Sequence, residues 1–153
     1  MDTERFIKAQ EGGEYDRALN EIRQGCKTGH WIWYVFPQMR GLGHSYMSDY
    51  YGISSIDEAK EYTSHPLLGL RLREITEALL ELPKEMTARE ILGGIDAMKV
   101  KSSMTLFHLA TGEQLFMDVL NRFYNGATCK PTTRMLGIKQ DNASESNRRP
   151  NIS

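Results

Sequence analysis

One apolar stripe at helical spacing constrains the fold of this chain more than any other feature. Its members are separated by steps of four and three residues and are Leu68, Leu72, Ile75, Leu79 and Leu82. Since an α-helix completes a turn every 3.6 residues, all of them fall on one side of a helix. Pro66 suits the first turn of this helix and Pro83 its end, because proline lacks a backbone N–H. The stripe predicts an amphipathic helix that covers a hydrophobic core.

Similar signals place helices along the rest of the chain. Apolar periodicity or capping residues predict them at residues 15–22, 55–63, 87–92, 96–110 and 115–123, with a further start near residue 45. Ser55 with Glu58 and Thr87 with Glu90 have the spacing of a capping box. Asp96 is expected to be the N-cap of the fourth of these helices.

No segment shows the sustained alternation of a strand. Residues 31–36 are apolar throughout, and their period does not distinguish a minimal strand from a buried turn. We therefore expect an all-α fold, a compact multihelical single domain of six to eight helices over residues 1–138. Residues 139–153 contain almost no apolar side chains and are expected to form a disordered tail.

The composition excludes several classes of protein. Of the 153 residues, 40% are hydrophobic and 25% are charged, and the net charge is −1. No global field therefore favours nucleic acid or an anionic membrane. The charged amino terminus lacks the apolar core of a signal peptide, and residues 31–36 are too short to span a bilayer. These features predict a cytoplasmic protein.

Metal and disulfide chemistry have little support. The two cysteines, Cys26 and Cys129, lie far apart in sequence, as in proteins of a reducing compartment. The four histidines form no pair at helical spacing that could share a zinc ion. We expect neither a metal nor a cofactor.

A loop with both tryptophans is the first candidate site. It supplies the residues His30, Trp31, Trp33, Gln38, Gly41, Gly43 and Ser45. Glycines before a helix leave backbone N–H groups open to an anion, and an indole ring can stack on a base or sugar. The structural alternative is that the tryptophans anchor the core, the glycines form a turn, and Ser45 is an N-cap.

The second candidate lies on the helix expected after Asp96. Lys99, Ser102 and Ser103 share one face of it. Because buried polar groups need partners, this face could line a cavity in which Lys99 binds an anion and the serines donate hydrogen bonds. Alternatively, Lys99 extends to water and the serines bond to carbonyl groups one turn back.

The order of several motifs resembles a known family. These motifs include His30-Trp-Ile-Trp33, Phe36-Pro-Gln38, Gly41-Leu-Gly43, His65-Pro-Leu-Leu-Gly69 and Ser102-Ser-Met-Thr-Leu-Phe107. They resemble the bacterial family called domain of unknown function 1810, some of whose members carry a mistaken calpastatin label. The resemblance implies a small, mainly helical, cytosolic fold with no settled activity. A weaker similarity, in size and aromatic content, is to proteins that process nucleotide and ADP-ribose derivatives.

Two kinds of function follow. The first is a small-molecule binding protein or enzyme, with a site for an anionic, ring-bearing metabolite (nucleotide or ADP-ribose-like) between the Trp31–Ser45 loop and the Lys99–Ser103 helix. It requires that the two segments line one cavity. The second is a non-catalytic module that binds another protein through an exposed apolar patch. The residues alone do not identify the ligand, the reaction or the oligomeric state.

Overall fold

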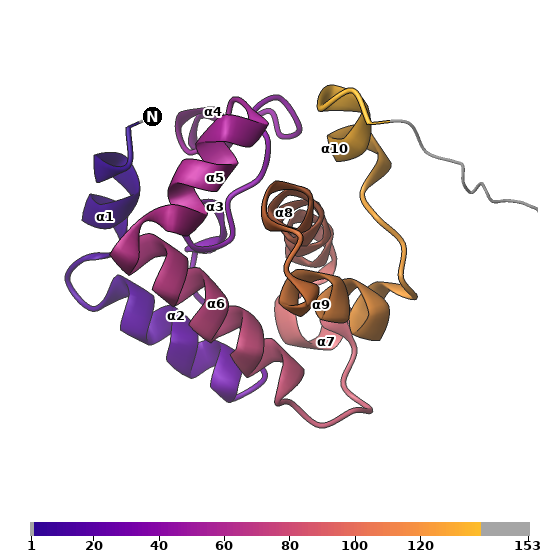
Figure 1. The fold of residues 1–153 in the computed structure, drawn as a ribbon. Coiled ribbons are helices and arrows are strands. Elements are labelled where there is room, and N and C mark those ends of the chain that lie inside the picture. The colour runs from indigo at the N-terminus through magenta and orange to yellow at the C-terminus, as the bar shows by residue number, and fades with distance from the viewer. Residues whose placement is uncertain (1, 139–153) are drawn as a thin grey trace, which may run out of the picture.

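The computed structural model describes residues 2–138, which fold into ten helices (Figure 1). In chain order they are α1 (Glu4–Gln10), α2 (Glu14–Arg23), α3 (Ile32–Val35), α4 (Tyr46–Tyr50), α5 (Ile56–Ser64), α6 (Pro66–Leu80), α7 (Ala88–Leu92), α8 (Gly94–Thr111), α9 (Gln114–Tyr124) and α10 (Lys130–Met135). The all-α prediction is confirmed. The helices outnumber the expected six to eight because α3, α4 and α10 have only four to six residues. The tail expected at residues 139–153 lies outside the described range.

Helix α8 occupies the centre of the fold. It packs against α3, α5, α7, α9 and α10, and Figure 1 shows it between α5 and α6 on one side and α9 and α10 on the other. Met104, Leu106 and Phe107 are each 0% exposed although they point in different directions around the helix axis. A helix that is covered on several sides needs no single apolar stripe.

The predicted stripe on α6 faces the core. Leu68, Leu72, Ile75 and Leu79 are each at most 1% exposed. The helix begins at Pro66, and the Nδ1 atom of His65 accepts hydrogen bonds from the amides of Leu67 and Leu68. The sequence signals for this helix therefore describe both its start and its buried face.

The capping predictions have mixed outcomes. Thr87 and Glu90 form the complete box at the start of α7. Ser55 accepts from the Glu58 amide, but the Glu58 carboxylate accepts from the Ser54 amide.

The prediction that Asp96 is an N-cap is wrong. Helix α8 already begins at Gly94, and Asp96 lies in its first turn. Gly93 has φ +84°, which lets the chain pass directly from α7 into α8 without further linking residues.

Residues 31–36 contain one helical turn, α3, in place of a strand. Within residues 2–138 the strand-like pairing is a single parallel bridge between Met39 and Ile53. Around it, the Arg40 amide donates to the Ile53 carbonyl, and the Ile53 amide donates to the Gln38 carbonyl. These bonds tie the segment after α3 to the segment before α5.

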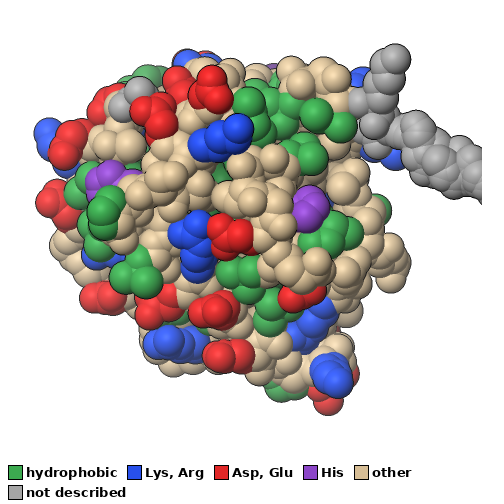
Figure 2. All heavy atoms as spheres, viewed as in Figure 1, with side chains coloured by type: hydrophobic (Ala, Val, Ile, Leu, Met, Phe, Trp, Pro, Cys, Tyr) green, Lys and Arg blue, Asp and Glu red, His purple; other side chains and the backbone are tan. Residues whose placement is uncertain are grey.

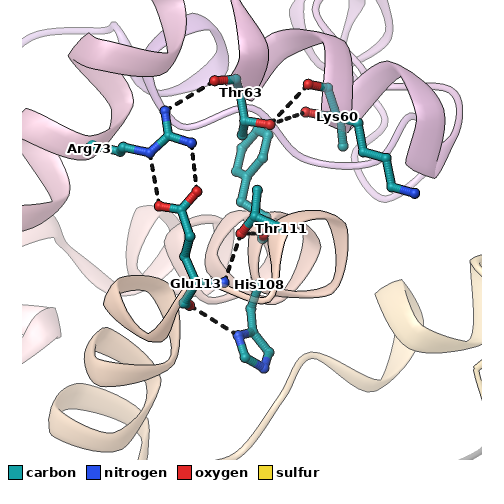
Figure 3. Close-up of polar contacts among 8 residues, drawn as sticks. Lys60, Thr63, Arg73, His108, Thr111 and Glu113 are labelled. Atoms are coloured by element: carbon teal, nitrogen blue, oxygen red, sulfur yellow. Dashed lines mark hydrogen bonds and ion pairs between the residues drawn. The ribbon is translucent and has the colours of Figure 1, made fainter.

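Arg73 links α6 to α5 and to the connection between α8 and α9 (Figure 3). From α6, Arg73 donates two hydrogen bonds to the Glu113 carboxylate, of 2.8 and 2.6 Å, and a third to the Thr63 carbonyl in α5. The Glu113 amide in turn donates to Thr111 Oγ1 at the end of α8. This network fixes the connection between α8 and α9.

The surface mixes charges of both signs. Figure 2 shows acidic and basic side chains interspersed over one face. No helix in the described part of the chain combines the length and the hydropathy needed to cross a bilayer.

Candidate functional site

The candidate site is an open groove of about 790 Å³ beside α8. Its walls come from the loop around residues 38–43, from the first half of α8 and from residues 127–131. We call it the lysine groove. The polar side chains on its walls include Gln38, Lys99, Lys101, Ser102 and Lys130. Leu42, Ile95, Met98 and Pro131 add apolar surface.

The groove combines positive charge with apolar walls. Three of its lining residues are lysines, and none is aspartate or glutamate. Ammonium groups attract carboxylates and phosphates, while the aliphatic walls contact the uncharged body of a ligand. The arrangement can therefore hold an anionic molecule that also presents apolar surface.

Lys99 connects the groove to a tryptophan. Its Nζ atom lies 5.0 Å from the centroid of the Trp33 ring, a distance at which an ammonium is attracted to the face of an indole. The same nitrogen lies 3.8 Å from Asp96 Oδ1, one turn earlier in α8. The side chain is 21% exposed, so the ammonium is held along the protein and does not extend fully into water.

Gly43 lets the loop in one wall of the groove pack closely against α4, because it has no side chain. A Cβ atom at this position would lie 2.3 Å from Ser48 Oγ and 2.7 Å from Ser48 Cβ. The loop can therefore approach α4 this closely only with glycine. Ser45 is the N-cap of α4 and accepts a hydrogen bond from the Ser48 amide. Because α4 has only five residues, its dipole adds little to the attraction of the loop amides for an anion. The helix start near residue 45 therefore gives weak support to anion binding by this loop.

The structure brings four predicted residues together in the groove walls: Gln38, Gly43, Lys99 and Ser102. Two more, His30 and Trp33, line a neighbouring hollow of about 360 Å³ together with Lys27 and Asp96. Ile95 belongs to both spaces, so the hollow and the groove lie on either side of it.

The remaining predicted residues lie elsewhere. Trp31 and Ser103 are each 0% exposed, which leaves no ring face or hydroxyl for a ligand to reach. Ser45 caps α4, and Gly41, with φ +99°, forms a turn beside Met135. For Trp31, Gly41 and Ser45 these positions agree with the structural alternatives. Ser103 agrees with neither reading, because its buried hydroxyl has no hydrogen-bond partner among residues 2–138 and so does not bond to a carbonyl one turn back.

Sequence reasoning missed the ion pair behind the site. Lys27 Nζ lies 2.7 Å from Asp96 Oδ2 and 4.9 Å from the centroid of the Trp31 ring, with its side chain only 6% exposed. It also donates to the Gly29 carbonyl at 2.5 Å. Asp96 was expected to be an N-cap, and Lys27 stands far from it in the sequence, so no local signal could have paired them.

Lys101, Lys130 and Cys129 were missed too. Cys129 Sγ lies 3.2 Å from Ser102 Oγ, and the Cys129 amide donates to Thr105 Oγ1. These contacts attach residues 127–131 to α8 and bring Lys130 to the groove. Lys101 follows Lys99 by two residues, a spacing that puts them on different faces of a helix, so the period of α8 did not suggest it.

Glu21 organises the turn that carries both tryptophans. Its carboxylate accepts hydrogen bonds from the amides of Thr28 and Gly29 and from Trp31 Nε1, at 2.8, 2.9 and 2.9 Å. Burial opposes ionisation of this carboxyl group, but the hydrogen bonds outweigh burial and lower its pKa to about 2. The charged form of Glu21 therefore fixes Trp31 in the core.

Comparison with known proteins gives two findings and one absence. The crystal structure of a conserved hypothetical protein from Mycobacterium tuberculosis is similar to this chain, with 43% sequence identity and a TM-score of 0.86. The match covers 90% of this chain and 97% of that protein. No curated protein is similar enough to match.

The sequence profile of one family matches residues 1–136, nearly the whole described range. It agrees with the resemblance noted from the loop and α8 motifs. The chain therefore belongs to the family described as protein of unknown function (DUF1810).

Proposed function

We propose that this protein binds a small anionic metabolite in the lysine groove. The supporting observation is the position of Lys99, which lines the groove, lies over Trp33 and shares that groove with Lys101 and Lys130. Lysines at three lining positions, with neither aspartate nor glutamate among the lining residues, favour a phosphate or a carboxylate. Asp96 lies 3.8 Å from Lys99 Nζ and offsets part of its charge, which leaves Lys101 and Lys130 to add to the attraction.

The expected ligand also carries a ring, as in a nucleotide or an ADP-ribose-like molecule. The groove itself has no aromatic side chain among its lining residues, so the ring contact is assigned to Trp33 in the adjoining hollow. His30 is the other predicted residue in that hollow and can donate or accept a hydrogen bond. A ligand that spans Ile95 would place its anion near Lys99 and its ring near Trp33.

We propose binding as the function and assign no catalytic residue. Gln38 and Ser102 line the groove with Lys99. The Ser102 hydroxyl donates to the Met98 carbonyl one turn back, as the structural alternative expected, so toward a ligand we assign it the role of an acceptor and assign Gln38 the role of a donor. We set this activity in the cytoplasm, consistent with Cys26 and Cys129 both being free thiols.

Thermal unfolding with four probes tests the proposal. A ligand that binds only the folded state raises the melting temperature as its concentration increases. Adenosine monophosphate and ADP-ribose should raise it more than inorganic phosphate or adenosine, which each carry only part of the ligand. If none of the four probes shifts the transition up to millimolar concentrations, the proposal fails.

Two variants localise the binding. Lys99→Met should weaken the best probe about tenfold or more, because a hydrogen bond to a charged group contributes roughly 1.5–3 kcal/mol. Lys60→Met is the matched control, since Lys60 is an exposed lysine of α5 that does not line the groove. Equal weakening by both variants would show a nonspecific charge effect.

A protein-binding module is the second candidate. Ile95 and Met98, one turn apart on α8 in the wall of the groove, are 77% and 60% exposed. Exposed apolar side chains of this size favour a contact with another protein. Under this alternative, Ile95→Ser would abolish partner binding, and none of the four probes would raise the melting temperature.

A further inference from the structure

The indole nitrogen of Trp33 is a buried donor without a protein acceptor. Trp33 Nε1 has no contact with solvent and no hydrogen-bond partner among residues 2–138. Trp31, two residues earlier, provides the contrast, since its Nε1 donates to Glu21 at 2.9 Å. A buried N–H that forms no hydrogen bond destabilises the folded state, so nearly all such groups have a partner.

Trp33 also forms part of the wall of a small cavity. Gln38, Ser48 and Lys99 contribute polar side chains to this cavity, and Ile32 and Phe36 contribute apolar ones. The centre of a water molecule has about 10 Å³ available in it. This volume is about the smallest that holds one water molecule.

We propose that this cavity is a binding site for one oxygen atom, held by the indole N–H of Trp33. The amide of Gln38 and the hydroxyl of Ser48 complete its surroundings. An oxygen here accepts from Trp33 and still has hydrogen-bond partners on the other side, as a buried water requires.

The cavity adjoins the lysine groove. Gln38 and Lys99 line both spaces, so a ligand bound in the groove lies next to the cavity. The occupant is then either a water molecule or a terminal oxygen of the ligand, such as a phosphate or carbonyl oxygen. The ligand oxygen rests on the proposed function, whereas the water molecule does not depend on it.

Protein labelled with ¹⁵N in its tryptophans tests the site. The chain has two tryptophans, and Trp33→Phe assigns the two indole signals by removing one of them. In the free protein we expect a rotating-frame Overhauser cross-peak between water and the Trp33 indole proton, with the sign of dipolar contact and not of chemical exchange. The Trp31 proton, bonded to Glu21, should give none.

Adenosine monophosphate then distinguishes the two sources. Loss of the water cross-peak with a shift of the Trp33 indole signal shows that a ligand oxygen has replaced the water. A cross-peak that persists while the probe binds shows that water is the occupant in both states. Absence of a dipolar cross-peak at Trp33 in the free protein overturns the inference.

The same data separate this inference from the proposed function. If the probe does not bind but the cross-peak is present, the oxygen site stands and the proposed function fails. If the probe binds and Trp33 shows neither cross-peak nor shift, the function stands and the oxygen site fails. Where the ligand oxygen is the occupant, Trp33→Phe should weaken the probe about two- to tenfold, the effect of losing one hydrogen bond.

Discussion

The ammonium of Lys27 lies 2.7 Å from the carboxylate of Asp96, and this contact joins the turn after α2 to the first turn of α8. The Lys27 side chain is 6% exposed and that of Asp96 is 20% exposed. A pair this far removed from water depends on both partners, because either charge alone would be poorly solvated.

Asp96→Asn should therefore destabilise the protein by about 3 kcal/mol, the usual cost of leaving one buried charge unpaired. The Lys27 ammonium would still donate to the Gly29 carbonyl, which carries no charge. The free energy of unfolding in urea measures the loss. Combining Asp96→Asn with Lys27→Met should recover part of it, since the most deeply buried of the charges is then removed. A stability of the single variant equal to that of the wild type would contradict the prediction.

The lowered pKa of Glu21 predicts that the folded protein loses stability in acid. Its pKa is about 2 in the folded protein against 4.5 as the ordinary value. A depressed carboxyl pKa stabilises the fold fully above the ordinary value, and this contribution disappears as the pH falls from about 4.5 to about 2. The contribution at neutral pH is on the order of 3 kcal/mol.

Glu21→Gln should remove this part of the pH dependence. Unfolding free energies between pH 2 and 7 should fall less steeply in acid for the variant, which should also be less stable than the wild type at pH 7. Glu77→Gln, an exposed carboxylate on α6, is the control. Parallel profiles for the wild type and Glu21→Gln would show that the hydrogen bonds from Thr28, Gly29 and Trp31 do not favour the charged form.

Gly69 is required by the close approach of α5 and α6. A Cβ atom at this position would lie 2.1 Å from the Thr63 carbonyl oxygen and 2.8 Å from Arg73 Nη1. Gly69→Ala should destabilise the protein by about 2 kcal/mol or more, because backbone must move to accommodate the methyl group. Thermal unfolding of Gly94→Ala gives the comparison, since a Cβ there meets no atom nearer than 3.8 Å. An equal effect of the two changes would exclude the steric explanation.

The ion pair between Arg73 and Glu113 should make a modest, salt-sensitive contribution to the free energy of unfolding. Their side chains are 34% and 35% exposed, so solvent screens the pair. A loss of about 1 kcal/mol is expected for Arg73→Lys. Lysine cannot reproduce the two parallel hydrogen bonds to the carboxylate or the third to Thr63 (Figure 3). The hydrogen bonds from Arg73 also lower the pKa of Glu113.

The dependence on salt distinguishes the electrostatic contribution of this pair from its packing contribution. The difference in unfolding free energy between the wild type and Glu113→Gln should shrink in molar sodium chloride, where screening acts within about 3 Å. A difference that does not change with salt would assign the contribution to packing.

The helices could be predicted because their signals are local. The stripe of α6 and the Thr87–Glu90 box need only residues within a few turns of one another. Such patterns report the period and the ends of a helix, which the neighbouring residues largely determine. Lys99 and Ser102 were expected on one face for the same reason, and both line the groove.

Only the tertiary structure determined which side chains these helix faces contact. Trp31 and Trp33 are two residues apart in sequence, yet Trp31 lies in the core with Glu21 as its acceptor and Trp33 lies under Lys99. Lys130 reaches the groove because Cys129 packs on Ser102. A sequence period specifies that a side chain points inward or outward, but its partner depends on how distant segments pack. The sequence by itself thus determined the helices, and packing determined the site.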